Sequence, residues 1–265
     1  MFVTIINDCR DSNERGRQMT RSSILFPQAN VTFMGVRNFS EIEAAGLLVD
    51  TLDASAGEEG VILVNAAPRH GSGKKWKNGT PFGFFHVGKT LVVSTIAGDT
   101  LSLVKKFDLL SDLKITDLPT VIDEMVKKGK FDKEDRDRVV RTQFRSYEYS
   151  PFLAYWLHNN EHITSEAYSL DEIPDAPKAV WWIDNFGNTK TTVLPEEVGF
   201  EPGKQLGTRF GEFTCYSRLK DVPDNESAII IGSSGYKNKR FLEIIVQGGS
   251  ASRAFNLYTG MKIIE

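Results

Sequence analysis

The sequence predicts an α/β protein of two domains: a doubly wound, Rossmann-like N-terminal α/β domain and a small C-terminal antiparallel β-barrel or sandwich. Apolar strands alternate with helical segments at the start of the chain, and apolar and polar residues alternate with a period of two after Lys178. An acidic, proline-rich stretch without periodicity separates the two patterns. We therefore expect domains at residues 1–170 and 178–265, with a linker at residues 171–177.

The N-terminal domain is predicted from a β-α-β-α-β order that continues into a mixed region. We expect strands at 2–6, 31–36, 60–65, 82–86 and 90–95, and helices at 13–26, 42–52, about 99–107, 118–128, 133–142 and 149–157. Pro27 ends the first helix, and Ser40-Glu41-Ile42-Glu43 has the pattern of a capping box. Parallel strands joined in this way bind ligands at their carboxyl ends, which here carry Asp8, Arg37 and Asn65.

The C-terminal domain is predicted from short segments with the period of a strand. These segments lie at 179–183, 190–193, 208–216, 228–231, 241–246 and 261–264. The turn between the first two, Asp184-Asn185-Phe186-Gly187-Asn188, brings a carboxylate, an aromatic ring and a carboxamide together. Such a cluster is typical of a recognition element.

Composition favours small-molecule chemistry in a reduced compartment. The 265 residues are 40% hydrophobic and 25% charged, and the net charge of −3 argues against a general binder of nucleic acid or of a membrane surface. The N-terminus lacks the pattern of a secretion signal, and no apolar run reaches about 18 residues. We expect a cytoplasmic protein in which Cys9 and Cys215 are reduced, semi-buried apolar residues.

Two further motifs have competing interpretations. His158-Asn159-Asn160-Glu161-His162 has the H-x-x-E-H spacing of a zinc site, but two asparagines disfavour a continuous helix, so we favour a helix end with exposed histidines and expect no metal. Gly71-Ser72-Gly73-Lys74-Lys75 lacks the full pattern of a nucleotide-triphosphate loop. It is either an active-site lid with His70 and Lys74 facing the strand ends or a solvated basic loop.

Three polar stretches remain open between structural and binding roles. Asp8 ends the first strand, where a carboxylate commonly accepts from ribose hydroxyls; as a helix N-cap it is less suited than Asp11. Residues 144–148, Phe-Arg-Ser-Tyr-Glu, either begin a helix or form part of a site. The small-residue turns at 232–236 and 247–251 are either ordinary hairpins or places where a flat ligand approaches the backbone.

Taken in order, these segments resemble the S-adenosylmethionine (SAM) hydroxide adenosyltransferases and the related SAM-dependent fluorinase and chlorinase. Ile183-Asp184-Asn185-Phe186-Gly187-Asn188 is similar to the family's I-D-x-F-G-N turn. Asp221-Val222-Pro223, the turn at 232–236, and Leu242-Glu243-Ile244 leading into 247–251 continue the resemblance. It is looser in the N-terminal half, where Gln18-Met19-Thr20 stands at the family's M-K-G.

The resemblance implies a homotrimer that binds SAM or adenosine between the first domain of one subunit and the second domain of its neighbour. It implies an in-line attack on the ribose 5′ carbon that releases L-methionine, with SAM as substrate and no cofactor. With water or hydroxide as the nucleophile, the other product is adenosine. No nucleic-acid or membrane partner is implied.

The resemblance also implies a role for most of the substrate-binding residues. At the nucleoside end, Asp8 would bind the ribose hydroxyls and Phe144 would pack on the sugar, while Asn188 would read the adenine edge with backbone help near Gly248. Phe186 lies in the same turn as Asn188, and we expect it to be a substrate-binding residue too. At the methionine end, Asp184 would pair with the ammonium.

Ser233 would bind the carboxylate of the methionine part. The arginine that holds this carboxylate in the halogenases is replaced here by Ser234, as in hydroxide-type members. A zwitterionic amino acid needs an anion for its ammonium and several donors for its carboxylate, so these implied roles are chemically reasonable.

The residues that would handle the nucleophile depart from the family. Hydrolytic members use an Asp, Arg and His set, which here becomes Ala67, Lys74 and Arg145. Ser146 aligns with a serine of the halide pocket, and His70 stands where that pocket has a threonine. His70, Lys74, Arg145 and Ser146 make a more cationic pocket, which leaves three interpretations open: hydroxide as nucleophile, another nucleophile such as halide, or binding without turnover.

Overall fold

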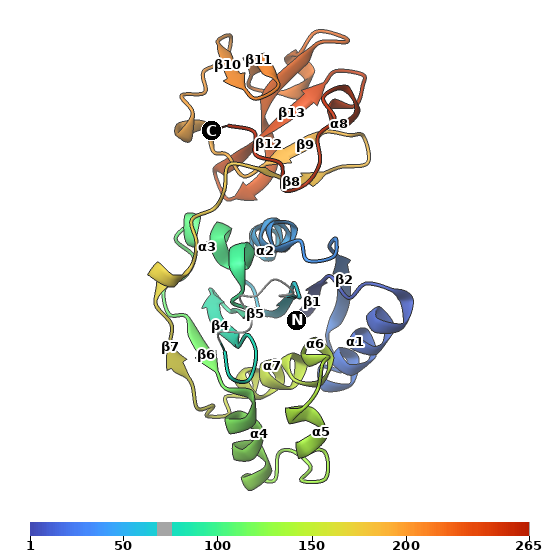
Figure 1. Ribbon diagram of the computed structural model, residues 1–265, viewed down its shortest axis with the longest axis vertical. Coiled ribbons are helices and arrows are strands. Elements are labelled where there is room, and N and C mark those ends of the chain that lie inside the picture. The colour runs from blue at the N-terminus through green and yellow to red at the C-terminus, as the bar shows by residue number, and fades with distance from the viewer. Residues whose placement is uncertain (68–75, 265) are drawn as a thin grey trace. The chain divides into compact units, whose positions relative to one another are not determined.

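The computed structural model describes residues 1–67 and 76–264 of the chain. These residues form two compact units, Met1–Pro174 and Asp175–Glu265 (Figure 1). Each unit contains its own sheet and its own cluster of buried apolar side chains. The predicted fold class, a Rossmann-like α/β region followed by a β domain, is confirmed.

The first unit follows the predicted alternation of strands and helices. Its elements are β1 (Phe2–Asn7), α1 (Ser12–Leu25), β2 (Asn30–Gly35), α2 (Glu41–Ser55), β3 (Gly60–Asn65), β4 (Phe82–Val87), β5 (Thr90–Thr95), α3 (Ser102–Lys106), β6 (Lys114–Thr116), α4 (Leu118–Lys127), α5 (Arg136–Val140), α6 (Arg145–Glu148), α7 (Ser150–His158) and β7 (Glu166–Ala167). One 3-10 turn, Gly98–Leu101, precedes α3.

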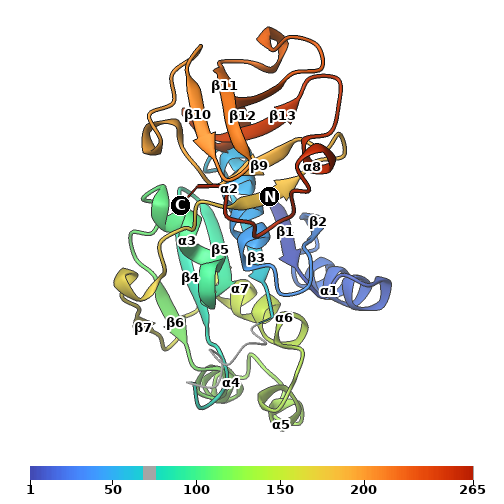
Figure 2. The same ribbon diagram turned by 45° about the horizontal axis from the view of Figure 1, so that its top comes forward.

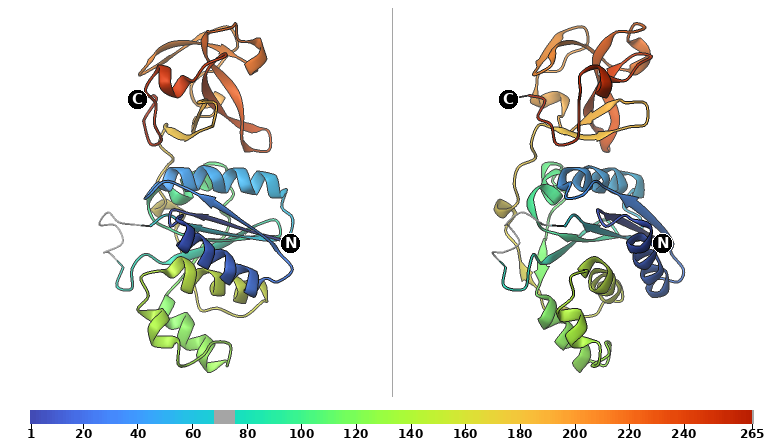
Figure 3. Two further views of the ribbon diagram at one scale, coloured as in Figure 1. Left: turned by 90° about the vertical axis from the view of Figure 1, so that its right-hand side faces the viewer. Right: turned by 45° about the vertical axis from the view of Figure 1, so that its right-hand side comes forward.

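The sheet of the first unit has the order β2-β1-β3-β5-β4-β6-β7. Strands β2, β1, β3 and β5 are parallel, and β4, β6 and β7 run antiparallel to their neighbours. Helices α2 and α3 lie on one face, and α1 and α7 lie on the other (Figure 3). After β1 the chain passes to β2 on one side of it and then crosses to β3 on its other side. The carboxyl ends of β1 and β3 therefore lie at a topological switch point.

Helix α1 begins and ends where local chemistry requires. The carboxylate of Asp11 caps it by accepting hydrogen bonds from the backbone N–H groups of Asn13 and Glu14, both at 3.1 Å. Pro27 follows the C-cap residue Phe26. Asp11, rather than Asp8, therefore caps the helix, which leaves Asp8 at the strand edge for another role.

The predicted capping box at the start of α2 is wrong. Ser40 precedes the helix but makes no side-chain cap, and Glu43 turns toward the loop after β2. Its carboxylate accepts a hydrogen bond from the backbone N–H of Arg37 at 2.6 Å and pairs with Arg37 Nε at 3.0 Å. A buried glutamate is stabilised more by a guanidinium together with a backbone N–H than by a single backbone N–H at the start of its own helix.

The second unit contains one six-stranded sheet (Figure 2). Its elements are β8 (Val180–Ile183), β9 (Thr189–Thr191), β10 (Gln205–Thr208), β11 (Gly211–Tyr216), β12 (Ser227–Tyr236), β13 (Lys239–Val246) and α8 (Ala251–Ala254). The strand order is β10-β11-β12-β13-β9-β8. Short 3-10 turns lie at Pro195–Glu197 and Leu219–Asp221.

Two details of this unit differ from the prediction. Strands β11 and β12 pair in parallel, so the sheet is mixed and not wholly antiparallel. The segment 261–264 forms no strand; Lys262 makes an isolated bridge with Ala179. A period of two reports alternate burial and does not reveal the direction of the partner strand.

None of the helices in the described part of the chain has both the length and the apolar character needed to cross a membrane.

Candidate functional site

Asp8 joins the carboxyl ends of three parallel strands. Its Oδ2 accepts hydrogen bonds from the backbone N–H groups of Phe39 at 3.0 Å and Ala67 at 2.9 Å, in the loops after β2 and β3. The residue is 7% exposed, and its Oδ1 lies 3.8 Å from Cys9 Sγ, a weak contact. The carboxylate thus fixes the strand-end loops through one oxygen and keeps most of the accepting capacity of the other.

A polar network lies under this edge of the sheet. Asn7 and Asn65 are register partners on β1 and β3, and Asn65 Nδ2 donates to Asn7 Oδ1 at 3.3 Å. Asn7 Nδ2 donates in turn to the fully buried Gln18 on α1 at 2.6 Å. Because each amide is held by a neighbour, the strand ends form a rigid base for the loops above them.

A cavity of about 570 Å³ opens at the same edge. Its walls come from the ends of β1, β3 and β5, the start of β4 and the segment that leads into α6: Cys9, Asn65, Ala67, Gly79, Thr80, Phe82, Thr95, Thr142, Gln143, Phe144, Arg145 and Ser146. Three residues predicted from the sequence, Phe144, Arg145 and Ser146, therefore share one cavity. Asp8 directly precedes Cys9 in its wall.

The ring of Phe144 is held in a stack. It packs on Tyr147 with 5.4 Å between ring centroids and 29° between planes. The guanidinium of Arg17, on α1, lies 5.2 Å from the Phe144 centroid and 4.4 Å from the Tyr147 centroid. Cation–π contacts of this kind stabilise the position of an aromatic side chain without covering its edge.

Arg145 brings a half-buried positive charge to the cavity. Its guanidinium donates to the backbone carbonyls of Thr80, at 3.3 Å, and of Asn78. Within the described residues both hydrogen bonds go to neutral acceptors, and the charge has no ion pair. Burial lowers the pKa of Arg145 from its ordinary value, which indicates a desolvated cation suited to an anionic partner.

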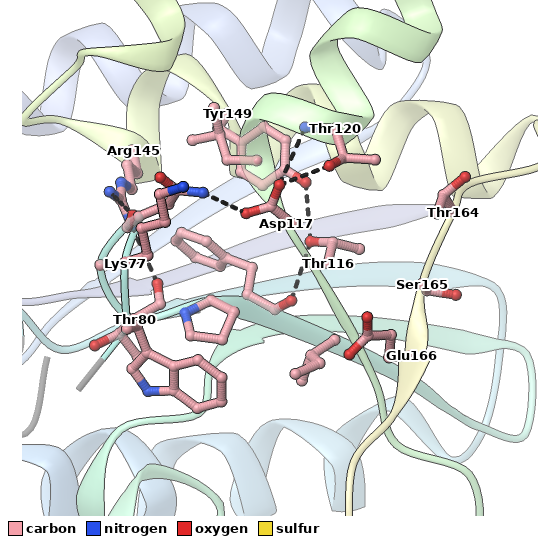
Figure 4. Close-up of a pocket in the computed structure, with 17 residues that line it drawn as sticks. Lys77, Thr80, Thr116, Asp117, Thr120, Arg145, Tyr149, Thr164, Ser165 and Glu166 are labelled. Carbon is pink, nitrogen blue, oxygen red and sulfur yellow. Dashed lines mark hydrogen bonds between the residues drawn. The ribbon is translucent and has the colours of Figure 1, made fainter.

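A second, smaller cavity of about 330 Å³ lies beyond Arg145 (Figure 4). Tyr149 closes one side of it and donates from its buried hydroxyl to Thr116 Oγ1 at 2.9 Å. Asp117 accepts from Asn78 and Thr120; although burial opposes the change, these hydrogen bonds lower the pKa of Asp117. This contact chain fixes residues 78–80, which carry the carbonyl acceptors of Arg145.

The sequence prediction missed two hydroxyl groups in the larger cavity. Thr80 and Thr95 line it, are 7% and 2% exposed, and have side-chain oxygens without a hydrogen-bond partner among the described residues. Unsatisfied buried hydroxyls are costly and often mark a place where a ligand or water binds. The signal was available for Thr95, which ends strand β5 at the edge that carries Asp8.

His70 and Lys74, predicted to face the strand ends, lie outside the described residues, as does most of the predicted lid loop.

In the second unit, Asp184 and Asn188 form one hydrogen-bonded turn. Asp184 Oδ1 accepts from the backbone N–H groups of Phe186 and Asn188, and its Oδ2 accepts from Asn188 Nδ2, all at 2.9 Å. Phe186 projects from the turn with 71% of its surface exposed. The side chains predicted to bind the two ends of a ligand are therefore bonded to each other, with acceptor capacity left on Asp184 Oδ2 and Asn188 Oδ1.

The turn packs against the loop that contains Gly248. Gly187 has φ +88°, and a Cβ there would lie 2.0 Å from Ser250 Oγ. Its carbonyl accepts from the backbone N–H of Ser252 at 3.0 Å. Glycine is required at 187 by both backbone conformation and space, and the contact brings the Asn188 turn and the Gly248 loop together.

Ser233 lies on an irregular part of β12, where the register with β13 shifts between Ile231 and Gly235. It is exposed, and its backbone N–H donates to Glu243 Oε1 at 3.3 Å. The neighbouring Ser234 is buried and accepts from Lys190 Nζ at 2.6 Å. Lys190 is two residues beyond Asn188, so this hydrogen bond joins the strand that leaves the turn to the strand that carries Ser233.

The two histidines of the H-x-x-E-H motif have separate partners. His158, at the end of α7, packs its ring on Phe26 and lies 3.7 Å from Glu59. His162 follows the helix and lies 3.5 Å from Glu124. Among the described residues, no group of three or more His, Cys, Asp or Glu side chains is placed to hold a metal ion.

Comparisons with known proteins add to this geometry. The chain matches the crystal structure of an uncharacterized conserved protein from Thermotoga maritima with a TM-score of 0.71 and 17% identity over 99% of both chains. It matches that of a conserved hypothetical protein from Thermus thermophilus with a TM-score of 0.65, again at 17% identity over 99% of both chains. At this identity the likeness concerns the fold. No curated protein sequence matches significantly.

The sequence profile of one family matches residues 178–264. The matched segment includes the Asp184–Asn188 turn, Ser233 and the Gly248 loop, the residues that carried the predicted resemblance, and it confirms that resemblance. Residues 178–264, which lie in the second unit, are thus similar to the SAM hydroxide adenosyltransferase C-terminal domain.

Proposed function

We propose that this protein hydrolyses SAM to adenosine and L-methionine. The observation that carries the proposal is the family match over residues 178–264. Two features of the geometry support it: the hydrogen-bonded Asp184–Asn188 turn in the second unit, and the strand-end cavity with a desolvated arginine in the first.

In this reaction the oxygen of water attacks the ribose 5′ carbon opposite the sulfur. The carbon–sulfur bond breaks, its electron pair returns to sulfur, and the sulfonium becomes the neutral thioether of methionine. The water loses a proton to solvent. Because the sulfonium is already an activated leaving group, the protein mainly needs to position the reactants and to remove bulk water from the nucleophile.

The first unit would bind the nucleoside part and the nucleophile. Asp8 would accept from the ribose hydroxyls through Oδ1, because Oδ2 is already occupied by two backbone N–H groups. Phe144 would pack on the sugar from its stack with Tyr147. Arg145 and Ser146 would face water or hydroxide in a cavity whose volume falls within the usual range for small-ligand sites.

The second unit would bind the adenine edge and the amino-acid end. Asn188 would offer its free Oδ1 to the adenine amino group, near the backbone of Gly248. Asp184 would pair with the ammonium through the remaining capacity of Oδ2, and Ser233 would donate to the carboxylate. We further propose a homotrimer in which each site combines the first unit of one subunit with the second unit of its neighbour.

Product analysis distinguishes the possible activities. Metal-free protein is incubated with SAM, with and without chloride, and the products are separated by chromatography. Adenosine and methionine in equal amounts, independent of chloride, are expected. A 5′-halo nucleoside would instead identify halide as the nucleophile, and unchanged SAM with measurable binding would identify a non-catalytic binder. Failure to bind SAM or adenosine at millimolar concentration would contradict the assignment as a whole.

A further inference from the structure

Lys190 places a positive charge in the interior of the second unit's sheet. Strand β13 lies between β9, which carries Lys190, and β12. The half-buried side chain crosses β13, and Nζ donates to Ser234 Oγ at 2.6 Å. The ammonium also lies 5.8 Å from the ring centroid of Trp181, which is itself almost fully buried.

Among the described residues, the direct contacts of this ammonium are with uncharged groups. Among the described residues its contacts are a neutral hydroxyl and an aromatic ring, and it forms no ion pair there. Glu243 is the register partner of Lys190 on β13, but Glu243 Oε1 accepts from the backbone N–H of Ser233. An ammonium has three N–H donors, so two remain available, and a partly desolvated cation is stabilised by an anion.

The position of the charge indicates which anion it fits. Ser234 adjoins Ser233 on the irregular part of β12, and Lys190 follows Asn188 by two residues on β9. The ammonium thus lies at the junction between the Asp184–Asn188 turn and the Ser233 segment. A ligand with a cationic and an anionic group close together, such as an α-amino acid, would have two partners here. The carboxylate in the turn would face its ammonium, and the ammonium at the junction would face its carboxylate.

We propose that Lys190 binds the α-carboxylate of the amino-acid part of the ligand, together with Ser233. This assignment rests on the proposed function and deepens it, because it names the residue that would distinguish an amino-acid conjugate from a bare nucleoside. Ser233 alone offers a neutral hydroxyl, because its backbone N–H already donates to Glu243, whereas a charge-assisted hydrogen bond is roughly twice as strong. Ser234 would hold the lysine in place through its Oγ.

The other possible role is purely structural: Lys190 could serve only to tie β9 to β12. Loss of a tie would weaken the sheet and would reduce the affinity for every ligand of the site by the same factor. Loss of a carboxylate partner would reduce the affinity only for ligands that have the carboxylate. The two roles are therefore distinguished by a thermodynamic cycle in which the ligand's carboxylate and Lys190 are each altered, alone and together, and the binding affinities are compared.

The experiment measures binding of S-adenosylhomocysteine and its α-carboxyl methyl ester to the full chain by calorimetry. This thioether lacks the sulfonium and is not activated for cleavage. At about pH 6 the amino groups of both ligands are largely protonated. Wild-type protein is expected to prefer the free carboxylate by about tenfold to hundredfold.

Lys190→Met is expected to remove this preference and to leave adenosine binding unchanged, which also shows that the variant is folded. Lys190→Arg keeps a cation and is expected to retain most of the preference. Lys239→Met, at an exposed position of the same unit, is the matched control and is expected to behave as wild type.

Each contrary result has a distinct meaning. If Lys190→Met keeps the wild-type preference, the assignment of Lys190 is overturned while the proposed function stands. The same holds if the substitution lowers the affinity for both ligands and for adenosine by the same factor. If Arg240→Met, which removes the guanidinium that donates to the carbonyls of Ser233 and Gly235, removes the preference instead, the cation has been misassigned. Wild-type protein that binds none of these nucleosides or SAM overturns the proposed function and the assignment together.

Discussion

Asp184 has a structural role and a proposed binding role, and substitution can separate them. Its carboxylate accepts two backbone N–H groups and one side-chain amide within its own turn. Asp184→Asn keeps an oxygen for the backbone donors, and Asn188 can present its own oxygen to the new amide after a flip. The change therefore removes the charge and preserves most of the turn.

Asp184→Asn is expected to weaken the binding of SAM by about tenfold more than that of adenosine, because the flip of Asn188 alters the adenine contact of both ligands and only SAM carries an ammonium. Asp184→Ala is expected also to lower the free energy of unfolding by about 1–3 kcal/mol, since it leaves the turn's donors unpaired. Calorimetry and urea unfolding measure the two effects. Equal losses of SAM and adenosine affinity in Asp184→Asn would contradict the ammonium role.

Gly187 provides a second test at a single residue. Its positive φ, and the 2.0 Å that would separate an added Cβ from Ser250 Oγ, predict that Gly187→Ala strains the backbone and separates the turn from the Gly248 loop. Gly203→Ala is the control, because Gly203 has φ +85° and open space around its Cβ position. We expect a loss of about 1 kcal/mol in the control and at least about 2 kcal/mol in Gly187→Ala.

Urea unfolding of both variants measures this difference. Equal losses would show that the Ser250 contact contributes nothing beyond the cost of the positive φ, and the packing of the two loops would then be unimportant.

At the scale of elements, α4 is tied to the segment that leads into β7 by one carboxylate. Burial opposes ionisation of Glu124, but hydrogen bonds from the backbone N–H of Thr164 and from Lys128 and His162 outweigh it and lower its pKa from 4.5 to about 2. The folded state therefore binds fewer protons than the unfolded state between these values. The stabilisation is present above about pH 4.5 and is lost as the pH falls toward 2.

Glu124→Gln is expected to lower stability at neutral pH by about 1 kcal/mol and to flatten its decline on acidification. Glu134→Gln, at an exposed position nearby, is the control and should leave the acid profile unchanged. Urea unfolding at a series of pH values provides the comparison. An acid profile of Glu124→Gln that parallels the wild type would show that this carboxylate does not stabilise the segment.

Most elements were predictable because their signals are local. Strands β1 to β5 and helices α2, α4 and α7 follow from apolar periodicity, whereas α1, which is mostly polar, is marked by Asp11 before it and Pro27 after it. The short strands β6 and β7 were missed because three and two residues carry too little periodicity. The capping box failed because Glu43 found a stronger partner in Arg37, a contact that no local pattern encodes.

The candidate site was predictable where a motif carries it. The bonds between Asp184 and Asn188 and the approach of the Gly248 loop follow from the turn's sequence and its glycine. The hydroxyls of Thr80 and Thr95 enter the cavity only through the pairing of β4 with β5, and Lys190 reaches Ser234 only because β9 and β12 flank β13. Such groups are brought together by strand order, which single-sequence periodicity does not specify.

At the scale of the whole molecule, the proposed site needs parts from both units, and a shared trimeric site makes a specific prediction. Phe144→Ala damages only the first-unit part, and Asp184→Ala damages only the second-unit part. Each variant alone should have little activity. Randomly mixed subunits should recover about a quarter of the wild-type sites, because only an undamaged first unit beside an undamaged second unit forms one.

Activity of co-expressed, co-purified variants, with the mass of the assembly from light scattering, tests this prediction. No recovery in mixed assemblies, or a monomer with full activity, would contradict a site shared between subunits.

The central claim, hydrolysis of SAM by attack of water on the ribose carbon, is tested most directly by isotope labelling. The protein is incubated with SAM in water enriched in ¹⁸O, and the products are analysed by mass spectrometry. We predict adenosine with one ¹⁸O atom at its 5′ oxygen and methionine without label, in equal amounts. Unlabelled adenosine, a 5′-halo nucleoside or unchanged SAM would contradict it.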